Sequence, residues 1–281
     1  MAYTDLMAKY IAPLHPIPAG MRPSGELKKP VKAVLFDVYG TILISQSGDI
    51  SIAKNKAQTA SRLKDLIKTY RYAGSVDDLV DAFFYAIEST HEAMHRQGID
   101  FPEVAIDRIW MQVLGATDIE TARRFAIEFE MIANPGYPMP HLADILTSLR
   151  DKGMIMGIIS NAQFFTPILF ETLCGAPPEK MGFSPGLIFY SYQYGVAKPS
   201  RRLFQLAAGE LKKMGIEEED ALYVGNDRLN DILPAKTEGF QTALFAGDKQ
   251  SLRLREGDSR CTGVIPDLVI TALNQLKTYI A

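Results

Sequence analysis

The first part of the chain to show a clear pattern is an apolar run that ends in a charged residue. Residues 34–36 (Val-Leu-Phe) are typical of a strand buried on both faces. Asp37 follows directly, where packing alone gives no reason for a carboxylate. Gly40 then allows a sharp turn, and Thr41 adds a hydroxyl. On this stretch alone, Asp37 is either a turn residue or a ligand-binding group at the carboxyl end of a strand.

Between residues 51 and 134 the pattern changes to a helical period. Apolar residues recur there every three or four positions, and no alternating run indicates a strand. The spacing predicts helices over residues 52–72, 76–97, 102–114 and 117–133. Residues 45–50 are predicted to form a loop before them, and the Pro- and Gly-rich segment 134–140 marks their end. This stretch therefore predicts an all-helical domain inserted into the chain.

From residue 141 onward, short apolar strands alternate with helices. The predicted strands are 154–160, 187–190, 221–224, 242–245 and, at an edge, 268–270. The predicted helices are 141–152, 164–174, 200–214, 231–239 and a last one that reaches Tyr279. Strands separated by helices of this length form parallel sheets with helices on both faces. We therefore expect an α/β fold with a doubly wound parallel sheet, to which strand 34–36 also belongs.

These patterns divide the chain into three parts. Residues 1–30 form an N-terminal extension, in which Thr4 is expected to cap a short helix that runs to Tyr10 or Ile11. The rest of this extension is a Pro-rich arm, either a strap across the domain or a contact to a second subunit. Residues 31–50 and 135–281 form the core, and residues 51–134 form the inserted helical domain.

Composition narrows the possible partners. The 281 residues are 47% hydrophobic and 22% charged, which is ordinary for a globular protein in water. A formal net charge of -3 gives no support to nucleic acid as a partner. No apolar run approaches the roughly 20 residues of a membrane span. The 2 cysteines are too few for a disulfide framework, so we expect a cytoplasmic protein, as a monomer or a homodimer.

Three further polar clusters come directly after predicted strands or just before a predicted helix. Each has an ordinary explanation as a turn, a loop or a helix cap. However, the carboxyl ends of parallel strands lie at one edge of a sheet, so we expect all three clusters to meet Asp37 there. Their residues are Ser160, Asn161, Lys198, Asn226, Asp227 and Asp231.

Together these side chains suit an anionic tetrahedral substrate. Asp37 is the candidate nucleophile. Hydroxyl, amide and cationic donors for the substrate oxygens come from Thr41, Ser160, Asn161 and Lys198. The hard oxygen ligands that Mg²⁺ prefers come from Asn226, Asp227 and Asp231. The predicted partner is therefore a small anionic molecule, and the predicted cofactor is Mg²⁺.

In their order and position, these stretches resemble the four motifs of the haloacid dehalogenase-like hydrolase superfamily. The matching residues are 36–41 (Phe-Asp-Val-Tyr-Gly-Thr), 159–161 (Ile-Ser-Asn), 198–199 (Lys-Pro) and 224–231 (Val-Gly-Asn-Asp-Arg-Leu-Asn-Asp). The resemblance implies a Rossmann-like core with a helical cap inserted between the first and second motifs. It also implies that Asp37 is the nucleophile and that the main-chain carbonyl of Tyr39 is a metal ligand.

Residue 39 leaves the reaction open. The phosphatases of the superfamily carry a second Asp there, which protonates the leaving group and then activates water. Tyr39 is a poor base at neutral pH, because a phenol has a pKa near 10. A Tyr at this position resembles the 2-haloacid dehalogenases, which form an aspartyl ester and use no metal. Against that, Asp227 and Asp231 keep carboxylates in the fourth motif, and Phe204 stands where the dehalogenases carry a functional Tyr.

Three interpretations follow from these departures. A Mg²⁺-dependent phosphatase of a small phosphorylated metabolite is the first, and a metal-free dehalogenase of a halocarboxylate is the second. A weakly active or non-catalytic binding protein on the same fold is the third. In either enzyme, the cap is expected to set specificity by closing over Asp37.

Two features of the cap have open explanations. Its first helix is basic, which indicates either a solvated face or attraction of an anionic substrate. The basic residues are Lys54, Lys56, Arg62, Lys64, Lys68 and Arg71. His91 and His95 lie four residues apart on one helical face, a spacing that can hold a metal, but no third ligand is evident nearby.

Overall fold

The computed structural model describes residues 1–46 and 57–280. Within these residues the core is a seven-stranded sheet in the order β1-β9-β8-β7-β2-β5-β6. All neighbouring strands are parallel except β1, which is antiparallel to β9. The strands are β1 (Ser24–Gly25), β2 (Ala33–Phe36), β5 (Ile155–Ser160), β6 (Phe183–Tyr190), β7 (Ala221–Gly225), β8 (Gln241–Phe245) and β9 (Leu268–Ile270). The predicted α/β fold with a largely parallel sheet is confirmed.

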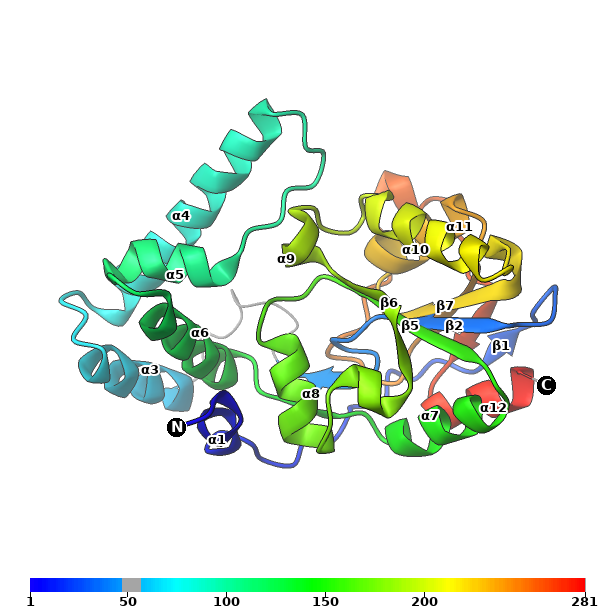
Figure 1. The fold of residues 1–281 in the computed structure, drawn as a ribbon, viewed down its shortest axis with the longest axis horizontal. Coiled ribbons are helices and arrows are strands. Elements are labelled where there is room, and N and C mark those ends of the chain that lie inside the picture. The colour runs from blue at the N-terminus through cyan, green and yellow to red at the C-terminus, as the bar shows by residue number, and fades with distance from the viewer. Residues whose placement is uncertain (47–56, 281) are drawn as a thin grey trace.

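Helices cover both faces of this sheet (Figure 1). Val34 and Phe36 of β2 belong to the apolar cluster that includes α7 (Leu142–Asp151) and α12 (Leu276–Tyr279). Ala33 and Leu35 point to the other face, where α10 (Arg202–Lys213) and α11 (Leu233–Thr237) pack. Because both faces are buried, the strand sequence is apolar throughout rather than alternating.

The helical insertion lies at one end of the sheet (Figure 1). It contains α3 (Ala57–Thr69), α4 (Val76–Arg96), α5 (Ile106–Leu114) and α6 (Ile119–Ala133). This confirms the predicted helical region, whereas its boundaries at residues 51 and 134 stay a prediction. Residues 47–50 of the predicted loop and residues 52–56 of the first predicted helix, including Lys54 and Lys56, lie outside the described residues. The core of the helical insertion is aromatic, with Trp110 stacked on Phe83 at 4.3 Å between ring centroids.

Two details of this region differ from the prediction. The third helix starts at Ile106 instead of 102, because Pro102 forms a bridge to Val196 of the core. In addition, β3 (Leu43–Ser45) and β4 (Gly136–Pro138) pair antiparallel where the chain leaves and re-enters the core. The sequence pattern missed this pair, because three residues are too few to establish a period.

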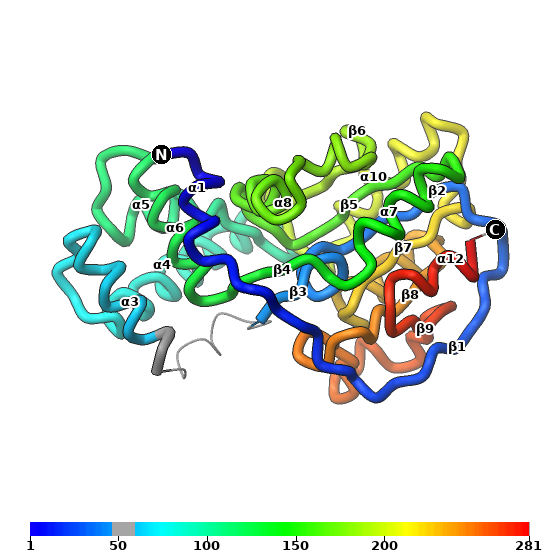
Figure 2. Tube along the Cα trace, turned by 90° about the horizontal axis from the view of Figure 1, so that it is seen from below, coloured from blue at the N-terminus to red at the C-terminus, as the bar shows by residue number. Residues whose placement is uncertain are grey.

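The N-terminal extension lies along the molecule as a strap (Figure 2). Its helix α1 (Tyr3–Ala8) buries Leu6 and Met7 and contacts both α6 and α8 (Thr166–Cys174). The prediction that Thr4 caps this helix is wrong, since Ala2 holds the cap position and Asp5 accepts a hydrogen bond from its backbone. Further along, Gly25 of β1 pairs with Leu268, so the prediction that β9 is an edge strand is also wrong.

The remaining turns are short. The fourth motif ends in a single wide turn, Arg228–Ile232, so the helix predicted over residues 231–239 begins only at Leu233, as α11. Elsewhere the chain has α9 (Ser191–Tyr194) and single turns at Pro178–Met181, Glu218–Asp220, Ser259–Cys261 and Leu273–Gln275.

Cys174 and Cys261 are both free. Among the described residues, no helix combines the length and the apolar character that crossing a bilayer requires.

Candidate active site

Asp37 lies at the carboxyl end of β2, the strand at which the order of the sheet reverses. Parallel neighbours β5 and β7 flank β2, and such a reversal opens a crevice for ligands. The backbone N–H of Asp37 still donates to the carbonyl of Val224 on β7, at 2.9 Å. Gly40 has a φ of 82°, and a Cβ atom there would come within 2.5 Å of the side chain of Asn226. The turn therefore requires glycine, and it holds Asp37 against the fourth motif.

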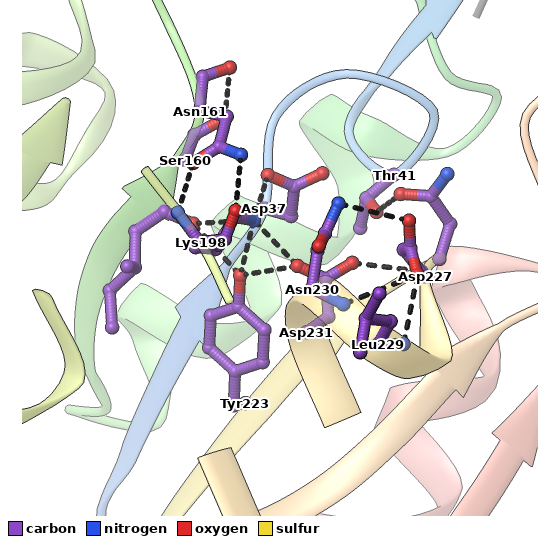
Figure 3. Close-up of polar contacts among 12 residues, drawn as sticks. Asp37, Thr41, Ser160, Asn161, Lys198, Tyr223, Asp227, Leu229, Asn230 and Asp231 are labelled. Carbon is purple, nitrogen blue, oxygen red and sulfur yellow. Dashed lines mark hydrogen bonds and ion pairs between the residues drawn. The ribbon is translucent and has the colours of Figure 1, made fainter. Parts of the chain in front are cut away.

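Lys198 forms hydrogen bonds with the carboxylates of both Asp37 and Asp231 (Figure 3). Its Nζ donates to Oδ1 of Asp37 at 2.7 Å and to Oδ1 of Asp231 at 2.5 Å. It also lies 3.0 Å from the hydroxyl of Tyr223 and 3.3 Å from the carbonyl of Ile159. Lys198 is only 5% exposed. A cation this deeply buried is tolerated because it is paired and fully hydrogen-bonded.

The pKa shifts in this cluster follow from burial and pairing. Burial lowers the pKa of Lys198, but the carboxylates of Asp231 and Asp37 outweigh it and the net shift is upward. Burial raises the pKa of Asp231, and the attraction of Lys198 opposes that rise. Lys198 is therefore an ammonium at neutral pH, and it offsets the negative charge beside Asp37.

Sequence reasoning missed Tyr223. It lies in the middle of β7, and its hydroxyl is 2.8 Å from the carbonyl of Ile159 and 3.1 Å from Oδ1 of Asp231. Its ring packs edge-on against Phe204, at 4.9 Å between centroids. A tyrosine within the apolar run 221–224 was the available signal, because a buried phenol needs a hydrogen-bond partner.

Asn161 holds the segment that carries Lys198. Its Oδ1 accepts from the backbone N–H of Lys198 at 2.7 Å, and its Nδ2 donates to the carbonyl of Lys198 at 3.1 Å. By contrast, Thr41 and Ser160 are fully buried and do not line the cavity beside Asp37. Thr41 donates instead to Oδ1 of Asn226, at 3.1 Å. Their predicted contact with substrate oxygens stays a prediction.

The two neighbouring residues of the fourth motif have different contacts. The Nδ2 of Asn226 donates to the carbonyl of Ser251 at 2.6 Å. The carboxylate of Asp227 accepts from the backbone of Leu229 and from both the backbone and the side chain of Asn230. It is also paired with Arg255, whose Nη2 lies 2.6 Å from Oδ2. Asp227 is therefore largely occupied by other contacts.

These groups surround one cavity of about 190 Å³. The lining residues are Asp37, Tyr39, Ser45, Asn161, Lys198, Asn226, Asp227, Asn230, Asp231, Ser251, Arg253 and Arg255. The structure thus brings most of the predicted site residues together, and it adds three from the loop after β8 that the sequence did not indicate. Within the described part of the chain, no residue of α3 to α6 lines this cavity.

Tyr39 lies on the wall of the cavity, but its hydroxyl is bonded to Oγ1 of Thr166 at 2.9 Å. Burial, together with the nearby carboxylate of Glu130, raises the pKa of the phenol. Tyr39 is therefore neutral at physiological pH and cannot act as a base in the way the second Asp of the phosphatases does.

The donors around the cavity suit Mg²⁺. Asp37 and Asp231 line the cavity and carry carboxylates, and Asn226 and Tyr39 line it as well. Mg²⁺ binds through one or two carboxylates and completes its shell with water and substrate phosphate, so this set fits. No group of three acidic, histidine or cysteine side chains in the described ranges forms a metal cluster of its own, and this includes His91 and His95.

Two further carboxyls lie at the base of the cap. Glu103 accepts from Ser191 at 2.7 Å and from Gln163 at 3.1 Å, beside backbone hydrogen bonds that join residues 101 and 103 to residues 195 and 197. Glu130 accepts from Asn134 at 3.0 Å. Burial raises the pKa of both carboxyls, that of Glu130 to about 7.

Residues 31–239 match the haloacid dehalogenase-like hydrolase family. The chain belongs to this family of hydrolases. A curated relative, the glyceraldehyde 3-phosphate phosphatase of Methanocaldococcus jannaschii, is 26% identical over 215 residues, which cover 75% of this chain and 83% of the relative. The resemblance drawn from the four motifs is therefore confirmed.

Solved structures of this hydrolase family share the fold. A 2-haloacid dehalogenase from Pseudomonas syringae pv. Tomato matches with a TM-score of 0.57 and 17% identity, over 89% of this chain and 98% of that one. A phosphatase of the family from Thermococcus onnurineus matches with a TM-score of 0.54 and 19% identity, over 88% and 97%. At these identities the matches establish the fold alone, and both reactions occur on it.

Proposed function

We propose that this hydrolase is a Mg²⁺-dependent phosphatase of a small phosphorylated metabolite. The observation that carries the proposal is the cluster at the sheet edge, where Asp37 and Asp231 share the ammonium of Lys198. An anionic nucleophile needs such a cation to approach an anionic phosphate. The likeness to a glyceraldehyde 3-phosphate phosphatase supports the same substrate class.

In this proposal Asp37 attacks phosphorus. A bond forms between a carboxylate oxygen of Asp37 and phosphorus, and the bond from phosphorus to the ester oxygen breaks. The leaving oxygen takes a proton from water. A second water then attacks phosphorus and gives a proton to the hydroxide left by the first water. The bond between Asp37 and phosphorus breaks, which releases inorganic phosphate and restores the carboxylate of Asp37. Lys198 remains protonated throughout, and its positive charge offsets the negative charge that gathers around Asp37 when the phosphate approaches.

The metal would be held by Asp37, the main-chain carbonyl of Tyr39 and Asn226, with Asp231 beside them. When bound, Mg²⁺ neutralises the charge between the carboxylate and the phosphate. We assign Asn226 rather than Asp227 to this role, because Arg255 and Asn230 occupy both oxygens of Asp227, whereas the Oδ1 of Asn226 accepts only from Thr41 among the described residues.

Tyr39 supports the second candidate, a dehalogenase in which Asp37 attacks carbon. A halide leaves without a proton, so that reaction needs no acid at residue 39. The phosphatase is favoured because Asp231 and Asp227 keep the fourth motif acidic and Phe204 has no hydroxyl. A non-catalytic binding protein is the third interpretation, and it requires that neither substrate class turns over.

A substrate panel separates the three. We expect phosphate release from p-nitrophenyl phosphate with Mg²⁺, loss of that release on addition of EDTA, and no release by Asp37→Asn. Halide release from 2-chloropropionate in the presence of EDTA would support the dehalogenase instead. If the folded protein turned over neither substrate and Tyr39→Asp gained nothing, the phosphatase proposal would be rejected.

A further inference from the structure

One wall of the cavity is a short segment, residues 251–255, in the loop after β8. The backbone N–H of Arg253 donates to the carbonyl of Asn226 at 3.0 Å, and the N–H of Arg228 donates to the carbonyl of Arg253 at 2.9 Å. The segment is thereby fixed to the backbone of the fourth motif. Ser251, Arg253 and Arg255 all line the cavity.

The three cations on the cavity wall are bonded differently. Lys198 is paired with Asp37 and Asp231, and Arg255 is paired with Asp227. Arg253 donates only through Nη1, to the carbonyls of Gln250 at 2.7 Å and Leu252 at 3.1 Å. Across the described ranges, no carboxylate forms an ion pair with Arg253.

This arrangement leaves Arg253 equipped to bind an anion. Neutral carbonyls hold its guanidinium in place without cancelling the charge, and its Nε and Nη2 keep their hydrogens free of protein acceptors among the described residues. A pre-positioned guanidinium forms bidentate hydrogen bonds with carboxylate or phosphate at little entropic cost. The volume of about 190 Å³ suits a phosphate group with a short organic chain.

We propose that Arg253 binds a second anionic group of the substrate, so that the preferred substrates are short phosphate monoesters that also carry a carboxylate or a second phosphate. The inference rests on the proposed phosphatase function for the reacting phosphate at Asp37. It assigns substrate selection to a loop of the core, whereas the sequence led us to expect it from the cap.

Kinetics on matched three-carbon substrates test this assignment. The substrates are glycerol 3-phosphate, 3-phosphoglycerate and glycerol 1,3-bisphosphate. For Arg253→Gln we expect kcat/KM to fall about 10- to 100-fold further with a doubly anionic substrate than with glycerol 3-phosphate, mainly through KM. Arg253→Lys should restore part of the preference. A loss confined to 3-phosphoglycerate identifies the second group as a carboxylate, and a loss confined to the bisphosphate identifies it as a phosphate.

Arg260→Gln is the matched control, because Arg260 is exposed, lies on the same loop and pairs with Asp258 outside the cavity. It should leave the substrate preference unchanged. Equal losses of Arg253→Gln on all three substrates would mean that Arg253 only supports its loop, and this result would overturn the inference. A wild-type protein without preference for either doubly anionic substrate would overturn it as well.

A binding measurement separates this inference from the proposed reaction. By calorimetry, the wild-type protein should bind 3-phosphonopropionate or 1,3-propanediphosphonate at least tenfold more tightly than propylphosphonate, and Arg253→Gln should lose that difference. An Arg253-dependent preference without turnover of any ester would refute the phosphatase and retain the inference. Equal binding of all three phosphonates, or binding of none, would reject it even if the esters are hydrolysed.

Discussion

At the edge of the core sheet, Asp37 and Asp231 share one ammonium group, whereas at the base of the cap Glu103 and Glu130 are bonded to hydroxyl and amide groups. All four carboxyls are largely removed from water. Burial raises the pKa of a carboxyl in both places, but at Asp231 the charge of Lys198 opposes the rise, whereas at Glu130 only the neutral amide of Asn134 does. The first arrangement provides a nucleophile, and the second fixes the joint between cap and core.

Removing the cation should have the largest effect. Lys198→Met leaves Asp37 and Asp231 buried without a positive partner, so we expect the free energy of unfolding at pH 7 to fall by about 3–5 kcal/mol. Urea denaturation followed by circular dichroism measures the change. Lys277→Met, which breaks an ion pair with Asp144 at the surface, should cost less than about 1 kcal/mol. Similar losses in both variants would contradict the special role of Lys198.

Replacing Tyr39 by an acid tests whether the cluster at the sheet edge lacks only a proton donor. Tyr39→Asp places a carboxyl where the phosphatases of the family have one, and we expect turnover of an alkyl phosphate to rise about 100-fold. Tyr39→Asn is the control, since an Asn side chain has nearly the same shape as an Asp side chain and cannot transfer a proton at neutral pH. An equal gain in both variants would show that the phenol only obstructs the cavity.

Glu130, at the base of the cap, should make the stability of the protein depend on pH. The carboxyl of Glu130 has a pKa of about 7 in the folded chain, against an ordinary value of 4.5. Since the unfolded chain loses its proton first, the free energy of unfolding falls as pH rises from 4.5 to 7. Glu130→Gln should remove the part of this fall that Glu130 contributes, about 1–3 kcal/mol. Asp231, whose pKa burial also raises to about 7, keeps its own part in the variant.

Urea titrations at several pH values between these limits measure that slope. The exposed Glu256→Gln should keep the wild-type slope, because its side chain lies in water in both states. If Glu130→Gln and wild type showed the same pH dependence, Glu130 would be ionised in the fold, and the effect assigned to its burial would be contradicted.

The sequence predicted the parts of the fold that repeat a pattern. Buried strands such as 221–224 appear as continuous apolar runs, and long amphipathic helices such as 76–97 extend over enough residues for a period to appear. The two-residue strand β1 and the pair β3–β4 are too short for that. Strand β9 was placed at the edge because nothing in the Pro- and Gly-rich arm predicted that Gly25 would cover it.

The same distinction applies to the candidate site. Asp37, Asn161, Lys198 and Asp231 follow strands or precede a helix, so their meeting at one edge of the sheet could be deduced from the topology. Arg253 and Arg255 belong to a loop without a period, and their position depends on hydrogen bonds to the backbone of the fourth motif. No local rule predicts such contacts between distant segments. The occupation of Asp227 by Arg255 was missed for the same reason.

The most direct test of the central claim, that Asp37 attacks phosphorus, is a single turnover in ¹⁸O-labelled water. We predict that the label appears in inorganic phosphate and that the peptide containing Asp37 keeps its natural mass, because water attacks phosphorus in the second step. Label in the carboxyl of Asp37 would contradict the account, since it would show that the intermediate is a carbon ester opened at the aspartyl carbonyl.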